Sequence, residues 1–230
     1  MKCAIMQPTF IPWTGYFNLM DQVDIFVFFD DVQLIRRSWQ VRNRILVNGV
    51  DSLITVPLTK SPQSTKIYEA RLTPDTSWVD KFIVRLNNSY AKAPYKDSIL
   101  DILSSAELKQ HSHLADMNIH FIKQLAHLIG LNILTERSKN LISSGVRSHK
   151  LYSICQHLKC DTYVSPRGSQ DYLEEDGVFN TGDISLIYNN YQPTPYPQIG
   201  TKEFVPYMSI IDLIANVGPE HSLDHIRGLN

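Results

Sequence analysis

Two apolar segments of the first thirty residues flank a more polar stretch. Residues 2–6 form a short apolar run that Pro8 ends, and residues 24–29 (DIFVFF) form a continuous run of β-branched and aromatic residues. Runs of this length and type are typical of strands that are buried on both faces. The stretch between them predicts a loop at 9–15 and a short helix at 16–22. The order strand, loop, helix, strand predicts a βαβ unit.

The rest of the chain alternates between strand-like and helix-like patterns. Asn48-Gly49 separates two strand-like segments and predicts a hairpin, because both residues tolerate a positive φ. Further on, apolar residues recur at helical spacing, and Gly130 is a natural end for one such helix. The predicted strands in this part are 44–47, 53–58, 66–71, 132–135, 162–165 and 184–188. The predicted helices are 77–90, 107–129, 148–158 and 209–216, the last closed by Gly218-Pro219.

These patterns predict a mixed α/β fold. We expect a mainly parallel, Rossmann-like sheet that contains the N-terminal βαβ unit. The chain has no internal repeat, low-complexity stretch or composition break that would mark a linker. The sequence therefore predicts a single domain over residues 1–230, with a helical elaboration at about 77–129.

Composition narrows the classes of partner. The net charge is -1 and the charged fraction is 20%. The chain therefore lacks the excess of positive charge that is typical of proteins that bind duplex nucleic acid, and no nucleic-acid partner is expected. No apolar stretch approaches the ~18 residues of a membrane span, and the N-terminus lacks the apolar region of a secretory signal. Three cysteines without a disulfide framework fit a reducing compartment. We expect a cytoplasmic protein.

The histidines and cysteines do not predict a metal site. His120 and His127 lie two helical turns apart, and no cysteine or carboxylate set completes a site with them or with His111 and His113. A solvated helix face is the better interpretation, so no metal is expected. Cys155 lies on the apolar face of its predicted helix and is expected to be a small buried side chain.

Polar residues that can carry chemistry follow the first two predicted strands. Gln7 comes directly after the first strand, and Asp30 and Asp31 come directly after the second. Because open α/β sheets bind ligands at the carboxyl ends of their strands, we expect these residues to meet at one edge. Trp13 and Tyr16 lie on the loop that leaves the first strand.

A second group follows within a dozen residues and consists of Trp39, Arg42, Asn43 and Arg44. Guanidinium groups bind phosphate or carboxylate through paired hydrogen bonds, and tryptophan offers a face for stacking. The alternative is that Arg42 and Arg44 pair with Asp30 and Asp31 in a structural network, which is compatible with a neighbouring site.

A third group is the turn Ser165-Pro166-Arg167-Gly168, which is followed by Tyr172. Backbone N–H groups of such a turn can hold an oxyanion or a phosphate, and the alternative is an ordinary turn. Gln198 lies in a proline-spaced loop, where it either lines a sugar or base or covers the core.

Several blocks of sequence occur in a recognisable order. They are AIMQPTFIPWTGYF, DIFVFFDDVQ and SWQVRNRI, and later DTYVSPRGSQDYL, YQPTPYPQ and SIIDLIANVG. Together they resemble the WbqC-like family over nearly the whole chain, most weakly in the helical middle. The resemblance implies a part in making bacterial O-antigen, lipopolysaccharide or another surface polysaccharide, and an activity as a glycine (aminoacyl) transferase on amino sugars. Many relatives begin the first block with His-Gln-Pro, whereas this chain has Met6, so no base is assigned there.

The residues and the resemblance together predict an acyl- or aminoacyltransferase that forms an amide on the amino group of a nucleotide-linked deoxy amino sugar. This chemistry needs a general base, hydrogen-bond donors that stabilise an oxyanion, and cationic side chains that bind a diphosphate. The predicted catalytic residues are Asp30, Asp31 and Ser165. The predicted substrate-binding residues are Gln7, Trp13, Tyr16, Trp39, Arg42, Asn43, Arg44, Gly168, Tyr172 and Gln198.

The sequence leaves the donor open between an adenylate and an acyl thioester, carried by coenzyme A or by an acyl carrier protein. Two alternatives to the transferase stay open as well. One is an ATP-dependent amide-forming ligase, since the βαβ unit faintly resembles that of nucleotidylyltransferases and pantoate ligases but lacks both histidines of their loop. The other is a non-catalytic nucleotide-sugar binding protein. The oligomeric state is not predicted.

Overall fold

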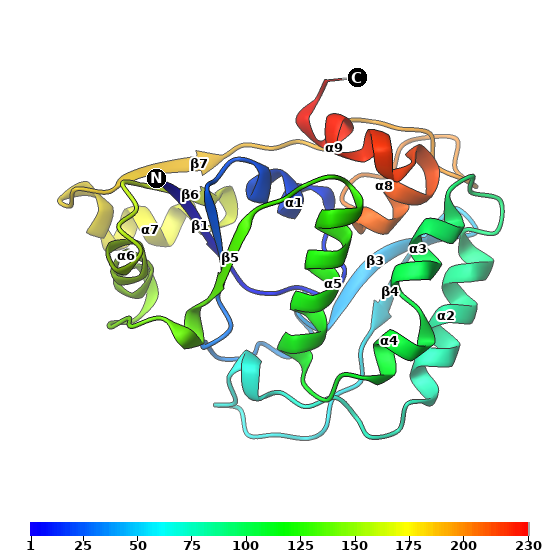
Figure 1. Ribbon diagram of the computed structural model, residues 1–230, viewed down its shortest axis with the longest axis horizontal. Helices are drawn as coiled ribbons and strands as arrows, with labels where there is room; N and C mark the ends of the chain where they lie inside the picture. The colour runs from blue at the N-terminus through cyan, green and yellow to red at the C-terminus, as the bar shows by residue number, and fades with distance from the viewer. Residues whose placement is uncertain (230) are drawn as a thin grey trace. The chain divides into compact units, whose positions relative to one another are not determined.

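The computed structural model describes residues 1–229 and confirms a mixed α/β fold (Figure 1). The strands are β1 (Lys2–Met6), β2 (Ile25–Phe28), β3 (Arg42–Val47), β4 (Val50–Thr55), β5 (Leu134–Arg137), β6 (Thr162–Pro166) and β7 (Ser185–Asn189). The α-helices are α1 (Thr14–Asp21), α2 (Ser77–Ser89), α3 (Lys96–Ile102), α4 (Ser105–Lys109), α5 (Leu114–Leu128), α6 (Arg147–His157), α7 (Gln170–Asp176), α8 (Ile210–Val217) and α9 (Pro219–Arg227). Short 3₁₀ turns are η1 (Ile67–Glu69), η2 (Ser138–Asn140), η3 (Arg167–Ser169) and η4 (Val178–Asn180).

The contacts within the chain group it into two compact units. The first unit contains Met1–Gln7, Asn18–Asp31 and Ile133–Gln192. The second unit contains Pro8–Phe17, Val32–Asn132 and residues 193–229. The helical stretch that the sequence predicts at about 77–129 belongs to the second unit. Each unit is described by itself below.

The first unit is built on a five-stranded parallel sheet with the order β5-β2-β1-β6-β7. β1 pairs with β2 in parallel, with Cys3 beside Ile25, and the predicted βαβ unit is therefore present. Counted along the chain, the strand order is 3-2-1-4-5, the order of a Rossmann-like sheet. It reverses direction between β1 and β6. Open α/β sheets bind their ligands outside the carboxyl ends of the two strands at such a point.

Alternate residues of the central strands pack into one core on a single face of this sheet. They include Cys3 and Ile5 of β1, and α6 and α7 cover the same face with a group of apolar side chains, among them Leu151, Ile154 and Leu173. The Sγ atoms of Cys3 and Cys155 lie 3.4 Å apart in this core. Contact with Cys155 and burial both raise the pKa of the Cys3 thiol. Cys155 is fully buried, as the sequence predicts.

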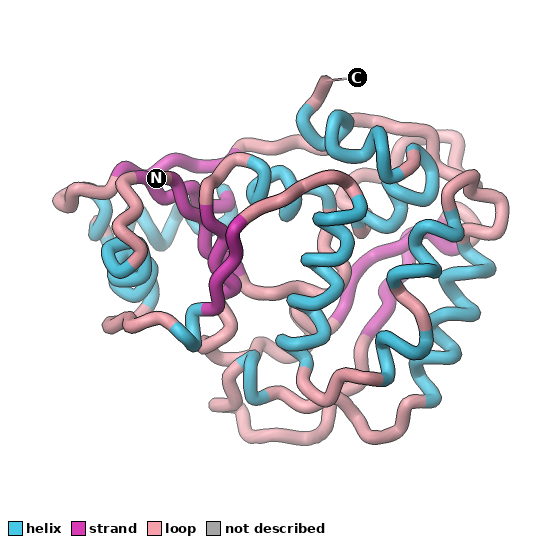
Figure 2. The backbone as a smooth tube through the Cα atoms, in the orientation of Figure 1, coloured by secondary structure: helices cyan, strands magenta, loops and turns pink. Residues whose placement is uncertain are grey.

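The second unit combines one antiparallel hairpin with helices, as Figure 2 shows by colour. β3 and β4 form the hairpin, with Arg42 opposite Thr55, and both Asn48 and Gly49 adopt a positive φ in its turn. The predicted hairpin is therefore confirmed. β3 packs against α2 and α8, and α8 in turn packs against α3. No helix within residues 1–229 is both long and apolar enough to cross a bilayer.

Several elements of the structure differ from the sequence-based prediction. The strand predicted at 66–71 is instead the turn η1 with isolated bridges, because its backbone bonds three separate partners rather than one strand. The helix predicted at 107–129 is two helices, α4 and α5, and extended His113 begins the second. The helices α3 and α7 were not predicted.

The sequence also predicts that the helix over 209–216 ends at Gly218-Pro219, but it does not predict the helix that begins there. Gly218, with φ 96°, ends α8 and directly precedes α9, whose first residue is Pro219. Proline suits the first position of a helix because its missing N–H would have no helical partner there. The same dipeptide therefore ends one helix and begins the next.

Candidate functional site

The carboxyl edge of the sheet in the first unit brings together residues that are far apart in the sequence. Gln7 follows β1, Asp30 and Asp31 follow β2, and Ser138 follows β5. The turn η3 follows β6. Because all these strands are parallel (Figure 1), the polar groups lie along one edge of one sheet.

Asp30 is the buried centre of this edge. Its side chain is fully buried, and its carboxylate accepts hydrogen bonds from Arg137 Nε at 2.6 Å and from the Lys139 backbone N–H at 3.2 Å. Its backbone N–H donates to Ser138 Oγ at 3.0 Å. A buried carboxylate is tolerated only when it is paired and hydrogen-bonded in this way. Asp30 therefore positions its neighbours.

Asp31 is the carboxylate of this pair that solvent can reach. One of its oxygens accepts the Ser138 hydroxyl at 2.6 Å, and the other is paired with Lys150 Nζ. The side chains of Asp31 and Lys150 are 14% and 15% exposed. The Lys150 ammonium also lies 5.6 Å from the centre of the Phe29 ring. Asp31 is thus fixed in orientation and still accessible.

The alternative network of Arg42 and Arg44 with the two aspartates is wrong. The partners of Asp30 and Asp31 are Arg137 and Lys150. Arg44 is paired across the hairpin with Asp51, to which its Nε donates at 2.8 Å. The sequence patterns did not point to Arg137, Ser138 or Lys150. The predicted strand ended at residue 135, two residues short of the end of β5, so Arg137 and Ser138 were not recognised as residues of the strand end.

The turn after β6 is open on its outer side. Ser165 is fully buried, and its hydroxyl donates to the Pro166 carbonyl at 3.3 Å. Gly168 is exposed, and a Cβ atom at this position would meet no atom within 4 Å. The Arg167 guanidinium donates to Asn190 Oδ1 at 2.7 Å. The backbone of this turn is therefore accessible at Gly168, whereas the Ser165 side chain is not.

Two tyrosines lie near this turn. Tyr172 on α7 faces the Arg147 guanidinium, which lies 5.7 Å from its ring centre. Tyr188 on β7 is in register with Ser165, and burial raises the pKa of its phenol. Within residues 1–229 the buried Tyr188 hydroxyl has no hydrogen-bond partner.

Asn43 lies in the second unit, where its side chain holds a loop. It is buried, and its Nδ2 donates to the carbonyl groups of Phe10 and Ile11 at 2.8 and 3.0 Å. Ser209 Oγ donates to the same Ile11 carbonyl at 2.6 Å. Ile11 has a φ of 34°, which is unusual for a β-branched residue. Asn43 thus fixes the shape of the loop 8–13, which precedes α1.

Trp13 lies at the end of this loop, whereas Tyr16, which the sequence also predicts on the loop, lies in the first turn of α1. The Trp13 ring covers Gly15, where a Cβ atom would lie 2.2 Å from the ring, and its centre is 5.3 Å from that of Tyr207. Tyr16 is 1% exposed, and burial raises the pKa of its phenol. Tyr16 therefore packs in the core. Trp39, by contrast, is 51% exposed.

Gln198 takes part in a buried polar cluster around Asp212 of α8. Gln198 Nε2 and the Tyr196 hydroxyl donate to Asp212 Oδ2 at 2.8 and 2.9 Å. Asp212 is fully buried, and its other oxygen has no partner within residues 1–229. Burial raises the pKa of Asp212 above the usual value, and the two hydrogen bonds oppose this effect.

This cluster predicts a pH dependence of stability. Because the pKa of Asp212 is higher in the folded state than the ~3.9 of an unfolded chain, wild-type stability is lost as pH rises from about 4 through the folded-state pKa. Asp212→Asn removes this titration. The unfolding free energy of the variant relative to wild type should therefore increase over that window, as urea unfolding at pH 4 to 8 measures. Asp101→Asn, at an exposed position of α3, is the control. A difference that does not change with pH contradicts the prediction.

The described residues contain no group of three or more side chains that could hold a metal ion. Arg42 lines a pocket of the second unit that is described below. The predicted site residues thus divide between the units. Gln7, Asp30, Asp31, Ser165, Gly168 and Tyr172 belong to the first, and Trp13, Tyr16, Trp39, Arg42, Asn43, Arg44 and Gln198 belong to the second.

Comparison with known proteins gives two matches. The model of the WbqC-like protein family matches residues 7–223. An uncharacterized protein of Mycobacterium tuberculosis, Rv1507c, is 30% identical over 228 residues, which cover 98% of this chain and 97% of that protein. No solved structure matches significantly.

Proposed function

The chain belongs to the WbqC-like protein family, and from this premise we propose that it is an acyl- or aminoacyltransferase of surface-polysaccharide synthesis. Its acceptor is the amino group of a nucleotide-linked deoxy amino sugar, and its product is an amide. Glycine is the expected aminoacyl group, and O-antigen is the expected polysaccharide.

The observation that carries this proposal is the order of the parallel sheet in the first unit. The order reverses between β1 and β6, and Gln7 and the turn η3 lie at the carboxyl ends of these two strands. Nucleotide-linked ligands bind at this place in Rossmann-like sheets. The exposed backbone at Gly168 leaves room for such a ligand, and Arg167 contributes a positive charge beside it.

Asp31 is the proposed base. Amide formation requires that a proton leaves the sugar nitrogen while the C–N bond forms and the bond from the acyl carbon to its leaving group breaks. Asp31 lies at the same sheet edge and is oriented by Ser138 and Lys150. Asp30, which is fully buried, acts as a positioning residue through Ser138 and the backbone.

The backbone of the turn η3 is the proposed oxyanion binder. Backbone N–H groups aimed at the developing charge stabilise a tetrahedral intermediate without reorganisation at the moment of reaction. Ser165 is buried, so its role is to hold this turn through the bond to the Pro166 carbonyl.

The test is to incubate the purified protein with nucleotide-linked amino sugars and glycyl or acyl thioesters and to record the masses of the products. The transferase predicts the mass of the amide without ATP. A product that requires ATP and appears with pyrophosphate identifies an amide-forming ligase. Binding of the sugar nucleotide without any product with either donor identifies a binding protein, and both of these results contradict the proposal.

A further inference from the structure

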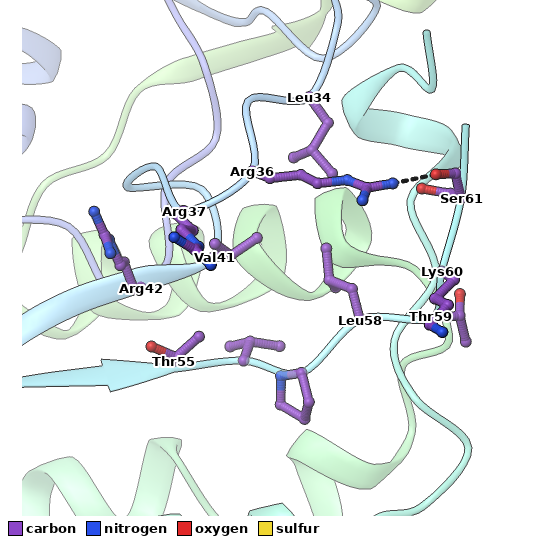
Figure 3. A pocket seen from close by; sticks show the side chains of 12 residues that line it. Leu34, Arg36, Arg37, Val41, Arg42, Thr55, Leu58, Thr59, Lys60 and Ser61 are labelled. Atoms are coloured by element: carbon purple, nitrogen blue, oxygen red, sulfur yellow. Dashed lines mark hydrogen bonds between the residues drawn. The ribbon is translucent and has the colours of Figure 1, made fainter. Parts of the chain in front are cut away.

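The second unit contains a pocket of about 470 Å³ whose lining is rich in cations. The loop before β3, the start of β3, the end of β4 and the loop after it form the pocket, as Figure 3 shows. Four of its lining residues are cationic: Arg36, Arg37, Arg42 and Lys60. None of the lining residues is an aspartate or a glutamate. Its volume is in the usual range for small-molecule sites, which is ~300–1,000 Å³.

None of the four cations has an acidic partner in the part of the chain that the structure describes, and Arg36 bonds the Ser61 carbonyl instead. No carboxylate within residues 1–229 forms an ion pair with the other three. Arg44, two residues further along β3, contrasts with them because Asp51 neutralises it. Uncompensated like charges around one cavity repel each other and raise the local concentration of anions. The pocket therefore favours an anionic ligand.

Arg42 supplies a specific donor. Its Nε is buried and has no hydrogen-bond partner among residues 1–229. A buried donor without an acceptor is costly, so it marks a position where an acceptor is missing. The guanidinium N–H groups are arranged to bind two oxygens of one phosphate at once. A phosphate oxygen is the acceptor that fits both the charge and the donor.

The rim of the pocket is held in a fixed shape. The Arg36 guanidinium reaches across to the Ser61 carbonyl, the bond drawn in Figure 3. Arg37 has a φ of 62°, a conformation that costs energy in a residue other than glycine. Strained backbone of this kind clusters at ligand sites, where the surrounding structure maintains it.

The floor of the pocket is apolar. Its apolar lining residues are Leu34, Val41, Val56, Pro57 and Leu58. A free phosphate ion would make no use of this surface, whereas the uncharged part of a phosphate ester would bury it. A smaller group of residues, Gln33, Leu34, Ile35, Arg36 and Gln63, lines an adjoining pocket, which shares Leu34 and Arg36 with the first.

We propose that this pocket binds a phosphate or diphosphate ester, with its charged group on Arg37 and Arg42, which lie together at one end of the pocket in Figure 3, and its uncharged part on the apolar floor. Two sources share this chemistry, a nucleoside diphosphate and a phosphopantetheine such as that of coenzyme A. The inference rests on the pocket alone and does not depend on the proposed transferase activity.

Calorimetric titration of the whole protein with pyrophosphate, uridine diphosphate and coenzyme A tests this site. We expect the esters to bind more tightly than pyrophosphate, and each affinity to fall as salt rises. Tighter binding of coenzyme A identifies the phosphopantetheine source, and tighter binding of uridine diphosphate identifies the nucleoside source. Absence of binding by all three at millimolar concentration overturns the proposal.

Charge-removing variants locate the binding. Arg37→Gln and Arg42→Gln should each weaken ester binding by about tenfold or more, because each removes a charge-assisted hydrogen bond. Arg85→Gln is the matched control, since Arg85 is exposed on α2 and does not line the pocket. The Arg37 side chain is exposed, so the Arg37 variant keeps the test valid if the Arg42 variant is unstable. Ester binding that both variants leave unchanged places the ligand elsewhere and overturns the proposal.

These titrations contain neither an amino sugar nor an activated acyl group. If the transfer assay gives no product, the result of the titrations is unaffected. If no ester binds, the sheet edge of the first unit is still the proposed acceptor site. The two proposals can thus fail separately.

Discussion

Asp31→Asn is expected to lower the rate of amide formation by about 10²–10⁴-fold, the range that a positioned general base contributes. The amide of asparagine can still accept the Ser138 hydroxyl, so the orientation of the edge is retained while proton abstraction is lost. The measurement is the initial rate of product formation, followed by mass spectrometry at saturating sugar nucleotide. A purely structural role predicts a change in stability with little change in this rate.

Lys150→Gln provides the matched comparison for Asp31→Asn. It breaks the same ion pair from the other side but leaves the carboxylate in place. We expect it to retain far more activity than Asp31→Asn. If the two variants lose activity equally, the ion pair itself is what matters, and Asp31 is not the base.

Asp30→Asn is expected to destabilise the protein by about 3–5 kcal/mol, the cost of leaving one partner of a buried ion pair without its countercharge. Arg137 and the Lys139 backbone N–H both bond this carboxylate, whose side chain is 0% exposed. Urea unfolding of the variant and of wild type measures the difference.

Two further variants separate charge from packing in this result. The double variant Asp30→Asn/Arg137→Gln removes both charges and should recover part of the lost stability. Asp80→Asn removes an exposed pair with Lys109, in which the two side chains are 62% and 36% exposed, and should cost less than ~1 kcal/mol. If Asp30→Asn and Asp80→Asn lower the unfolding free energy by the same amount, the ion pair of Asp30 does not stabilise the protein as a buried pair should.

The two strands β1 and β2 of the first unit could be predicted from the sequence because they are short apolar runs. The runs at 2–6 and 24–29 correspond to β1 and β2, and the hairpin signal at Asn48-Gly49 corresponds to β3 and β4. The prediction was incomplete at Gly218-Pro219. This dipeptide predicts the end of a helix, but Pro219 is also the first residue of α9.

The candidate site could be predicted only in part. The residues after β1, β2 and β6 were found because strand ends mark the ligand edge of an α/β sheet. Their partners were not, since Arg137 and Lys150 are separated from the aspartates by more than a hundred residues. Residue type also does not reveal burial. Asn43 and Gln198 look like ligand-binding groups, yet both are buried and bond the protein itself.

The proposed transferase requires that the turn after β6 contacts a nucleotide-linked amino sugar. Its most direct test is calorimetric titration with that sugar nucleotide of Gly168→Ala and Gly168→Leu, made in the Arg42→Gln variant so that the cationic pocket contributes little. A side chain at Gly168 enters open space in the structure, so both variants should fold with unchanged unfolding midpoints. The account predicts a graded loss of affinity, with leucine costing tenfold or more. Equal affinity in all three proteins would contradict it.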